Sequence, residues 1–284
     1  MLGAALGSAF AYWREGRGGV AQHPEQVRAL LGVPLLAQVP RMSMRRWPRS
    51  STPANLIDSA GGQYEFLGVM LDRYMNERYG GTVLVTAVRG RRDNPVIALN
   101  VAYTLCNDAC RVVLVDADLR GRQLTRLLQF EGVLGLSDLA KASVSFARLR
   151  TGGALFGDES WTFVPAGTLA ADSYRMLRSS NVVRLLDEIQ RDGPDGPPVR
   201  VVLRGPPTLE VADAGTLAVL ADGVVLHVAR GTALEDIQQA EETILMAGGL
   251  LVGFVFEDGR PRVFQRRRWP TADTPRRPLV GAVR

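Results

Sequence analysis

Two aspartates and an arginine follow an apolar run near the middle of the chain. Asp116, Asp118 and Arg120 come directly after Val112–Val115. In α/β proteins, side chains at the carboxyl end of a parallel strand lie in the crevice where ligands bind. Two aspartates spaced i, i+2 can hold Mg²⁺ directly or through water, and can orient a nucleophile. The alternative is structural, with a capped helix and a salt bridge to Arg120.

A second polar cluster follows an apolar run nearer the C-terminus. The run Val199–Leu203 leads into the turn sequence RGPP, Asp213 opens a short helical stretch, and Asp222 precedes the next apolar run. This order of strand, turn and acidic helix start is more specific than the aspartate pair alone.

The segment TAVRGRRDNPVIALN, Thr86–Asn100, lies between a strand-like run and a helix-like run, where phosphate-binding loops occur. It contains one glycine, three arginines and a proline, but no lysine. Guanidinium groups bind phosphate well. The segment therefore predicts a weak anion or nucleotide site, with these candidates: Gly90, Arg91, Arg92 and Asn94.

The elements that would position these groups alternate along the chain. The expected strands are continuous apolar runs, which are typical of strands buried on both faces. Their alternation with helical stretches predicts an α/β fold, with a mostly parallel sheet and helices on both faces. The expected strands are Thr82–Val85, Val112–Val115, Thr162–Val164, Val199–Leu203, Val224–Val228 and Leu250–Phe256. The expected helices are Leu56–Tyr79, Val96–Asp108, Gly121–Phe130, Ser173–Gln190, Ala212–Leu220 and Leu234–Ala247.

The two ends of the chain differ in composition from its middle. The first 13 residues are apolar, whereas a membrane-spanning helix needs about 20. We interpret them as the end of a membrane helix or as a short interfacial anchor. The basic linker Arg41–Pro53 suits an acidic membrane surface or plain solvent equally. We therefore divide the chain into a membrane-proximal segment with its linker (1–54), a folded domain (55–258) and a disordered basic tail (259–284).

Composition sets further bounds on function. The net charge is +5, and Lys141 is the only lysine. The arginine excess could favour nucleic acid, acidic lipid or an acidic partner, but we favour GC-rich base composition as its origin. Cys106 and Cys110 lie on one expected helix face, with no second His or Cys pair. They indicate core residues in a reducing cytoplasm rather than a metal site or a disulfide framework.

Taken together, these motifs resemble the cytoplasmic domain of bacterial tyrosine autokinases and their relatives in capsule and exopolysaccharide synthesis. These proteins are P-loop ATPases of the division-site-positioning and partition type. The resemblance implies a P-loop NTPase-like sheet with helices on both faces. It also implies that the N-terminal segment follows the second membrane helix of a polysaccharide co-polymerase. The matching stretches are His23–Pro40, Val112–Arg120, Gly135–Leu139, Val164–Gly167, Pro206-Pro207 with Asp213, and Asp222–Leu226.

The departures from the family pattern concern the phosphate chemistry. Asp93, Asn94 and Pro95 stand where the Walker A motif of the family has Gly, Lys and Ser or Thr. Arg204 stands where the Walker B strand ends in an aspartate. An arginine cannot ligate a cation, and the loop lacks the lysine that reaches the phosphates.

Two further departures concern autophosphorylation and assembly. The kinases carry a tyrosine cluster in the C-terminal tail, but here no tyrosine follows Tyr174. The E-x-x-R-x-x-R helix that packs the kinases into a ring keeps only Glu65. We therefore do not expect a ring oligomer built on that contact.

These observations predict a non-catalytic, kinase-like pseudo-ATPase at the inner, cytoplasmic face of the bacterial plasma membrane. It would support or regulate exopolysaccharide or capsule biosynthesis and export through contact with a membrane co-polymerase. The vestigial candidates for catalysis are Asp116, Asp118 and Arg120, and the two aspartates would be metal ligands only if Mg²⁺ bound. We expect neither ATP nor Mg²⁺ as a cofactor. The alternatives are an active tyrosine kinase or ATPase with an atypical phosphate loop, and a partition-type regulator that binds nucleic acid.

Overall fold

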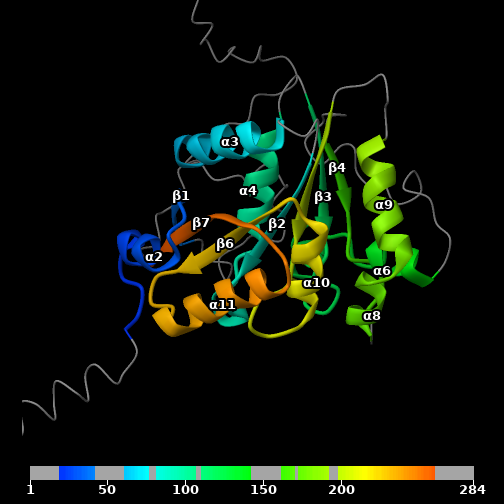
Figure 1. The fold of residues 1–284 in the computed structure, drawn as a ribbon. Helices are drawn as coiled ribbons and strands as arrows, with labels where there is room; N and C mark the ends of the chain where they lie inside the picture. The colour runs from blue at the N-terminus through cyan, green and yellow to red at the C-terminus, as the bar shows by residue number, and fades with distance from the viewer. Residues whose placement is uncertain are drawn as a thin grey trace, which may run out of the picture.

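A computed structural model describes residues 19–41, 61–76, 81–106, 110–141, 161–169, 172–191 and 198–259. Its centre is a seven-stranded sheet in the order β1-β7-β6-β2-β5-β3-β4, in which every pairing of neighbouring strands is parallel (Figure 1). The strands are β1 (Leu35–Pro40), β2 (Gly81–Ala87), β3 (Arg111–Asp116), β4 (Trp161–Val164), β5 (Val199–Arg204), β6 (Gly223–Ala229) and β7 (Leu251–Asp258). The predicted parallel α/β sheet is confirmed.

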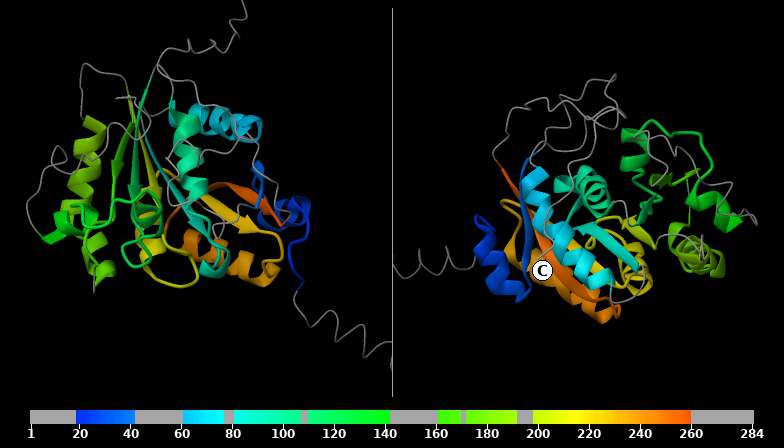
Figure 2. Two further views of the ribbon diagram at one scale, coloured as in Figure 1. Left: turned by 180° about the vertical axis from the view of Figure 1, so that it is seen from behind. Right: turned by 90° about the horizontal axis from the view of Figure 1, so that it is seen from above.

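Helices cover both faces of this sheet (Figures 1 and 2). One face carries α3 (Gly61–Asn76), α4 (Val96–Leu105) and α5 (Gln123–Leu127). The other face carries α2 (Pro24–Leu31), α6 (Leu136–Lys141), α8 (Ser173–Leu177), α9 (Ser180–Arg191), α10 (Asp213–Leu220) and α11 (Leu234–Met246). A single turn of 3₁₀ helix, η3 (Gly90–Arg92), lies between β2 and α4.

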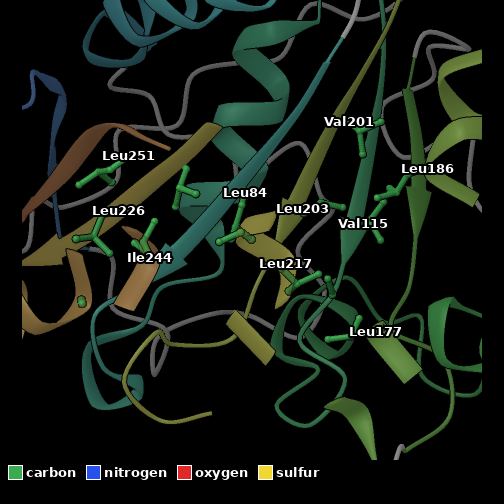
Figure 3. Close-up of a cluster of buried hydrophobic side chains, with 14 of the residues drawn as sticks. Leu84, Val115, Leu177, Leu186, Val201, Leu203, Leu217, Leu226, Ile244 and Leu251 are labelled. Atoms are coloured by element: carbon green, nitrogen blue, oxygen red, sulfur yellow. The ribbon is translucent and has the colours of Figure 1, made fainter. Parts of the chain in front are cut away.

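Side chains of the strands pack into two hydrophobic cores, one on each face of the sheet. Leu84 of β2 packs into the core under α10 and α11, whereas its neighbours Val83 and Val85 pack into the core under α3 and α4. Figure 3 shows the first of these cores, where Leu84 and Leu226 of the sheet lie near Leu217, Ile244 and other aliphatic side chains. Burial of each such side chain stabilises the fold by about 1.5–3 kcal/mol. This double burial explains why the strands are continuous apolar runs.

The sheet begins earlier in the chain than the sequence predicted. β1 is an edge strand that pairs with β7, and α2 packs against α11. Residues assigned above to the membrane-proximal segment therefore belong to the folded unit. The physical reason is burial, since Leu36 and Val39 of β1 are each only 2% exposed. The helix α2 ends at Gly32, which takes the left-handed conformation with φ of 65°.

Two predicted helices are shorter or broken. The helix expected over 173–190 is two helices, α8 and α9, separated at Arg178 and Ser179. Serine favours helix ends because its hydroxyl competes for backbone hydrogen bonds. The helix expected over 121–130 is confined to α5, and Gln129 after it has a left-handed φ of 63°.

Within the part of the chain that the structure describes, no helix is both long and apolar enough to cross a membrane. The predicted membrane anchor, almost all of the linker, and the basic tail lie outside the described residues.

Candidate functional site

The strand order brings three strand ends together. β2 lies between β5 and β6, and β5 lies between β2 and β3, so the carboxyl ends of β2, β5 and β3 are neighbours. From β2 the chain moves first to β3 and β4 on one side, and later to β6 and β7 on the other. In open α/β sheets such a switch point forms a ligand-binding crevice. The loop after β2, the aspartates after β3 and the arginine at the end of β5 therefore face one another.

Arg204 is at the centre of this crevice. It pairs in register with Asp116 on β3 and with Val85 on β2, and it is 2% exposed. One terminal nitrogen of its guanidinium donates to a carboxylate oxygen of Asp118, and the other donates to Asp93. A buried guanidinium with a carboxylate on each side is an ion-pair network that links β5 to the loops after β2 and β3.

The charges in this network depend on one another. Burial alone would lower the pKa of Arg204, but the carboxylates of Asp93, Asp116 and Asp118 raise it above its ordinary value. The guanidinium therefore remains charged. Burial raises the pKa of Asp93, although Arg204 and then His227 oppose this effect. One cation thus faces three buried carboxyl groups.

Asp116 is held by contacts within its own motif. Its Oδ2 accepts hydrogen bonds from the backbone N–H of Thr125 at 2.7 Å and from the Thr125 hydroxyl at 2.8 Å. The same hydroxyl accepts from the Ala166 N–H at 2.8 Å. Asp116 Oδ1 has no hydrogen-bond partner among the described residues. Burial raises the pKa of Asp116 to about 6, against the opposing effects of Arg204 and Thr125.

Arg120 does not pair with the two aspartates that precede it. Its Nε donates to the Ser173 hydroxyl at 2.7 Å and lies 3.6 Å from Oδ2 of Asp213. The salt bridge of Asp118 is instead made with Arg204, and Asp118 also accepts from the Gly121 N–H at 2.7 Å. Arg120 therefore connects the end of β3 to α8 and α10.

The loop after β2 is fixed at several points by other elements. The Gly90 N–H donates to Oε1 of Glu210 at 2.7 Å. Arg89 forms a bidentate ion pair with Asp236 of α11, with both distances 2.7 Å. Arg92 donates to the backbone carbonyl oxygen after β6, that of Arg230. A Cβ atom at Gly90 would lie 2.6 Å from a Glu210 oxygen, so a larger residue there would displace the Glu210 side chain.

The other two residues of the predicted anion site point to different places. Arg91 is exposed. Asn94 is buried, and its amide nitrogen donates to Glu257 at 2.8 Å at the end of β7. Burial alone would raise the pKa of Glu257, but His227 and Asn94 lower it below its ordinary value. The nearest nitrogen of His227 lies 3.7 Å from Glu257. Asn94 therefore contacts a carboxylate, where a phosphate-binding residue would contact an anion from solution.

Sequence reasoning identified Arg204 and Asp93 as departures but missed their ion pair, together with the carboxylates of Glu210, Asp236 and Glu257. The signal available was charge: each lies near the end of an expected strand or the start of an expected helix. Nothing in the spacing indicates which carboxylate meets which loop atom.

The resemblance to P-loop ATPases implies Mg-nucleotide as the ligand at this switch point, so the side chains present here can be tested against that ligand. On the metal side, the Arg204 guanidinium lies against Asp118, a carboxylate that would face the cation. On the phosphate side, Glu210 accepts from the loop N–H and Asp93 adds a second carboxylate. Among the residues described, no three His, Cys, Asp or Glu side chains are grouped to hold a metal ion. The charges present do not fit Mg-nucleotide.

Comparisons with known proteins support the resemblance in sequence and in fold. No family model matches the chain. Tyrosine-protein kinase YwqD of Bacillus subtilis (strain 168) is 24% identical over 196 residues, which cover 68% of this chain and 78% of that protein.

Two solved kinase domains show the same fold. The kinase domain of Escherichia coli tyrosine kinase ETK superposes with a TM-score of 0.71 at 18% identity, and the match covers 89% of this chain and all of that domain. The BceF tyrosine kinase domain gives 0.70 at 19% identity, covering 86% of this chain and all of that domain. The chain is therefore a sequence relative of a bacterial tyrosine kinase, and it has the P-loop NTPase-like fold of bacterial tyrosine kinase domains.

Proposed function

We propose that this protein is a non-catalytic member of the bacterial tyrosine kinase group that supports or regulates exopolysaccharide or capsule biosynthesis and export. Its kinship with YwqD and its fold support the biosynthetic context. The observation that carries the non-catalytic assignment is the buried ion-pair network of Arg204 with Asp93 and Asp118.

Phosphoryl transfer requires positive charge around the transferred group. In P-loop enzymes, a lysine, backbone N–H groups and Mg²⁺ stabilise the transition state. Here the loop presents Asp93, the Gly90 N–H is bonded to Glu210, and Arg204 is bonded to Asp118, a carboxylate that would face the metal. Each ~1.4 kcal/mol of lost transition-state stabilisation costs a factor of ten in rate. The loss of lysine, hydroxyl and strand-end aspartate together removes useful turnover.

We place the protein at the inner face of the plasma membrane, in contact with a membrane co-polymerase. The resemblance of His23–Pro40 to the segment after the co-polymerase membrane helix supports this placement, as do the apolar N-terminal residues and the basic linker. In the structure this stretch forms α2 and β1, which pack on α11 and β7. A membrane-linked N-terminal region would therefore be attached firmly to the sheet.

A direct test combines chemistry with genetics. The purified full chain is incubated with ATP and Mg²⁺, hydrolysis is measured, and phosphotyrosine is sought by mass spectrometry, with the ETK kinase domain as the positive control. We expect neither hydrolysis nor phosphotyrosine above background. Deletion of the gene should reduce the amount or chain length of exported polysaccharide, and the native gene should restore it.

The competing function is an active kinase with an atypical phosphate loop, which the kinship with YwqD favours. Mg²⁺-dependent turnover by the native chain that is lost in the Asp118→Asn variant would establish that function and overturn our proposal. A deletion strain with normal polysaccharide would remove the biosynthetic role whatever the outcome of the chemical assay.

A further inference from the structure

The charges in the crevice have the signs that a bound Mg-nucleotide would bring from solution. A metal ion would place positive charge against the carboxylates after β3, and here Arg204 does so, bonded to Asp118 and adjacent in register to Asp116. A nucleotide would place negative charge on the loop after β2, and here Glu210 accepts from the Gly90 N–H and Asp93 lies within the loop itself. Each ligand charge has a counterpart within the chain.

These internal charges also make the contacts that a ligand makes between elements. A bound nucleotide bridges the loop after β2 to the strand ends beside it. Here Arg204 of β5 makes that bridge, because it contacts Asp93 in the loop after β2 and Asp118 in the loop after β3. The three side chains are only 2–6% exposed. Two further contacts, Gly90 with Glu210 and Arg89 with Asp236, hold the same loop to the segment after β5 and to α11.

Burial makes this bridge effective. An ion pair in a low-dielectric interior is screened little by salt, and removal of one partner leaves an uncompensated buried charge. Arg204 cannot lose its proton, because the surrounding carboxylates raise its already high pKa. The loop is therefore held to β5 by charges that belong to the chain itself.

We propose that the Arg204 network replaces Mg-nucleotide as the structural ligand of this fold, so that the domain keeps one conformation whatever the nucleotide concentration. This inference rests on the proposed function and adds its regulation: contact with the membrane partner is constitutive, not switched by nucleotide. Arg204 is a positioning residue for the loop, with Asp93 and Asp118 as its counter-ions.

Hydrogen exchange and a coupled set of variants test this proposal on the full chain. The amides of residues 88–96 should be protected without ligand, and Mg-ADP or Mg-ATP should change neither their exchange nor the melting temperature. The variant Arg204→Met should lose that protection at least tenfold. A triple variant with Asp93→Asn, Asp118→Asn and Arg204→Met removes all three charges together, and it should recover much of the stability that the single variant loses.

The matched control is Arg200→Met, on the same strand. Arg200 is also buried and paired, but with Asp72 of α3, away from the crevice. This variant should lower global stability while residues 88–96 keep their protection relative to the rest of the sheet. If Arg204→Met does not fold, the triple variant still tests the proposal. A network of coupled charges predicts that the triple variant folds, because its three charges are removed together.

Two results would overturn the inference. One is a rise in melting temperature or in loop protection when Mg-nucleotide is added to the native chain. The other is additive behaviour of the three substitutions. Nucleotide binding without turnover would overturn this inference while leaving the non-catalytic function intact, whereas turnover would overturn both.

Discussion

The exits of β3 and β2 both carry polar residues into the crevice, but the first aspartate after β3 finds its partner much nearer along the chain than the polar groups after β2 do. After β3, Asp116 is bonded to Thr125, nine positions away. After β2, Gly90 and Asp93 are bonded to Glu210 and Arg204, 120 and 111 positions away. Of the exit that matches the family motif, Asp116 is thus satisfied locally, whereas Asp118 and Arg120 reach Arg204 and Ser173, 86 and 53 positions away. The exit that departs from it is completed by charges from elsewhere in the fold.

This difference shows how each exit is held in place by groups within the chain. Asp116, which matches the family motif, is held by two hydrogen bonds from Thr125. An altered loop needs new partners, and here they come from β5, the segment after it, and α11. Asp116 Oδ2, Asp118, Asp93 and the Gly90 N–H all have partners, whereas Asp116 Oδ1 has none among the described residues.

The largest effect should come from breaking the long-range contacts at Arg204. The substitution Arg204→Met leaves two carboxylates buried beside an apolar side chain, which should cost about 3–5 kcal/mol of unfolding free energy. Urea unfolding followed by circular dichroism measures this. A loss below about 1 kcal/mol would show that the ion pairs are not the main connection between β5 and the loop.

The next effect concerns Asp116 and pH. Its folded-state pKa of about 6 lies above the value of an unfolded aspartate, about 3.9. The folded state therefore binds the proton more tightly. The contribution of this group to stability is fully present below about pH 4 and is lost as the pH rises to about 6, by at most ~3 kcal/mol.

The variant Asp116→Asn tests that sign. Unfolding free energies measured from pH 4 to pH 7 should depend less on pH in the variant than in the native chain. The two should differ most above pH 6, where the variant carries no buried charge at this position. An unchanged pH dependence would assign the titration to another group in the crevice.

A smaller effect is expected at Thr125, the local partner of Asp116 after β3. The substitution Thr125→Val keeps the shape of the side chain but removes its hydrogen bonds to Asp116 and from the Ala166 N–H. Because both partners are buried, the cost should be about 1–3 kcal/mol. The loss should be larger at pH 7 than at pH 4.5, since the threonine hydroxyl favours the charged carboxylate. Equal losses at both pH values would mean that Asp116 is already protonated at neutral pH.

The smallest effect belongs to the exposed pair on the loop. The Arg89 side chain, hydrogen-bonded to Asp236, lowers the pKa of that carboxyl. The Arg89 side chain is 46% exposed, so the pair should contribute only about 0.2–1 kcal/mol. The variant Asp236→Asn should match the native chain in high salt and differ slightly in low salt. A loss comparable to that of Arg204→Met would mean that the loop depends on its surface contacts.

The sheet and most of its helices could be predicted because their signal is local. Strands such as β2 and β6 are continuous apolar runs, and burial on both faces requires such runs. Asp116 and Asp118 could be placed in a crevice for the same reason, since they follow a buried strand directly. The pairing of β1 with the sheet could not be predicted, because an edge strand is joined to the fold by its partner β7, more than 200 residues later.

By itself, the sequence determined the parallel sheet and the position of the crevice, and it identified Asp93 and Arg204 as departures from the family pattern. These properties depend on apolar periodicity and on motif residues at fixed spacing. Only the tertiary structure decided which charged groups meet in the crevice. Arg204 meets Asp93 and Asp118, and Glu210 meets Gly90, because strand order places β5 between β2 and β3. Pairing of charges follows distance in space, and the folding of the sheet sets that distance.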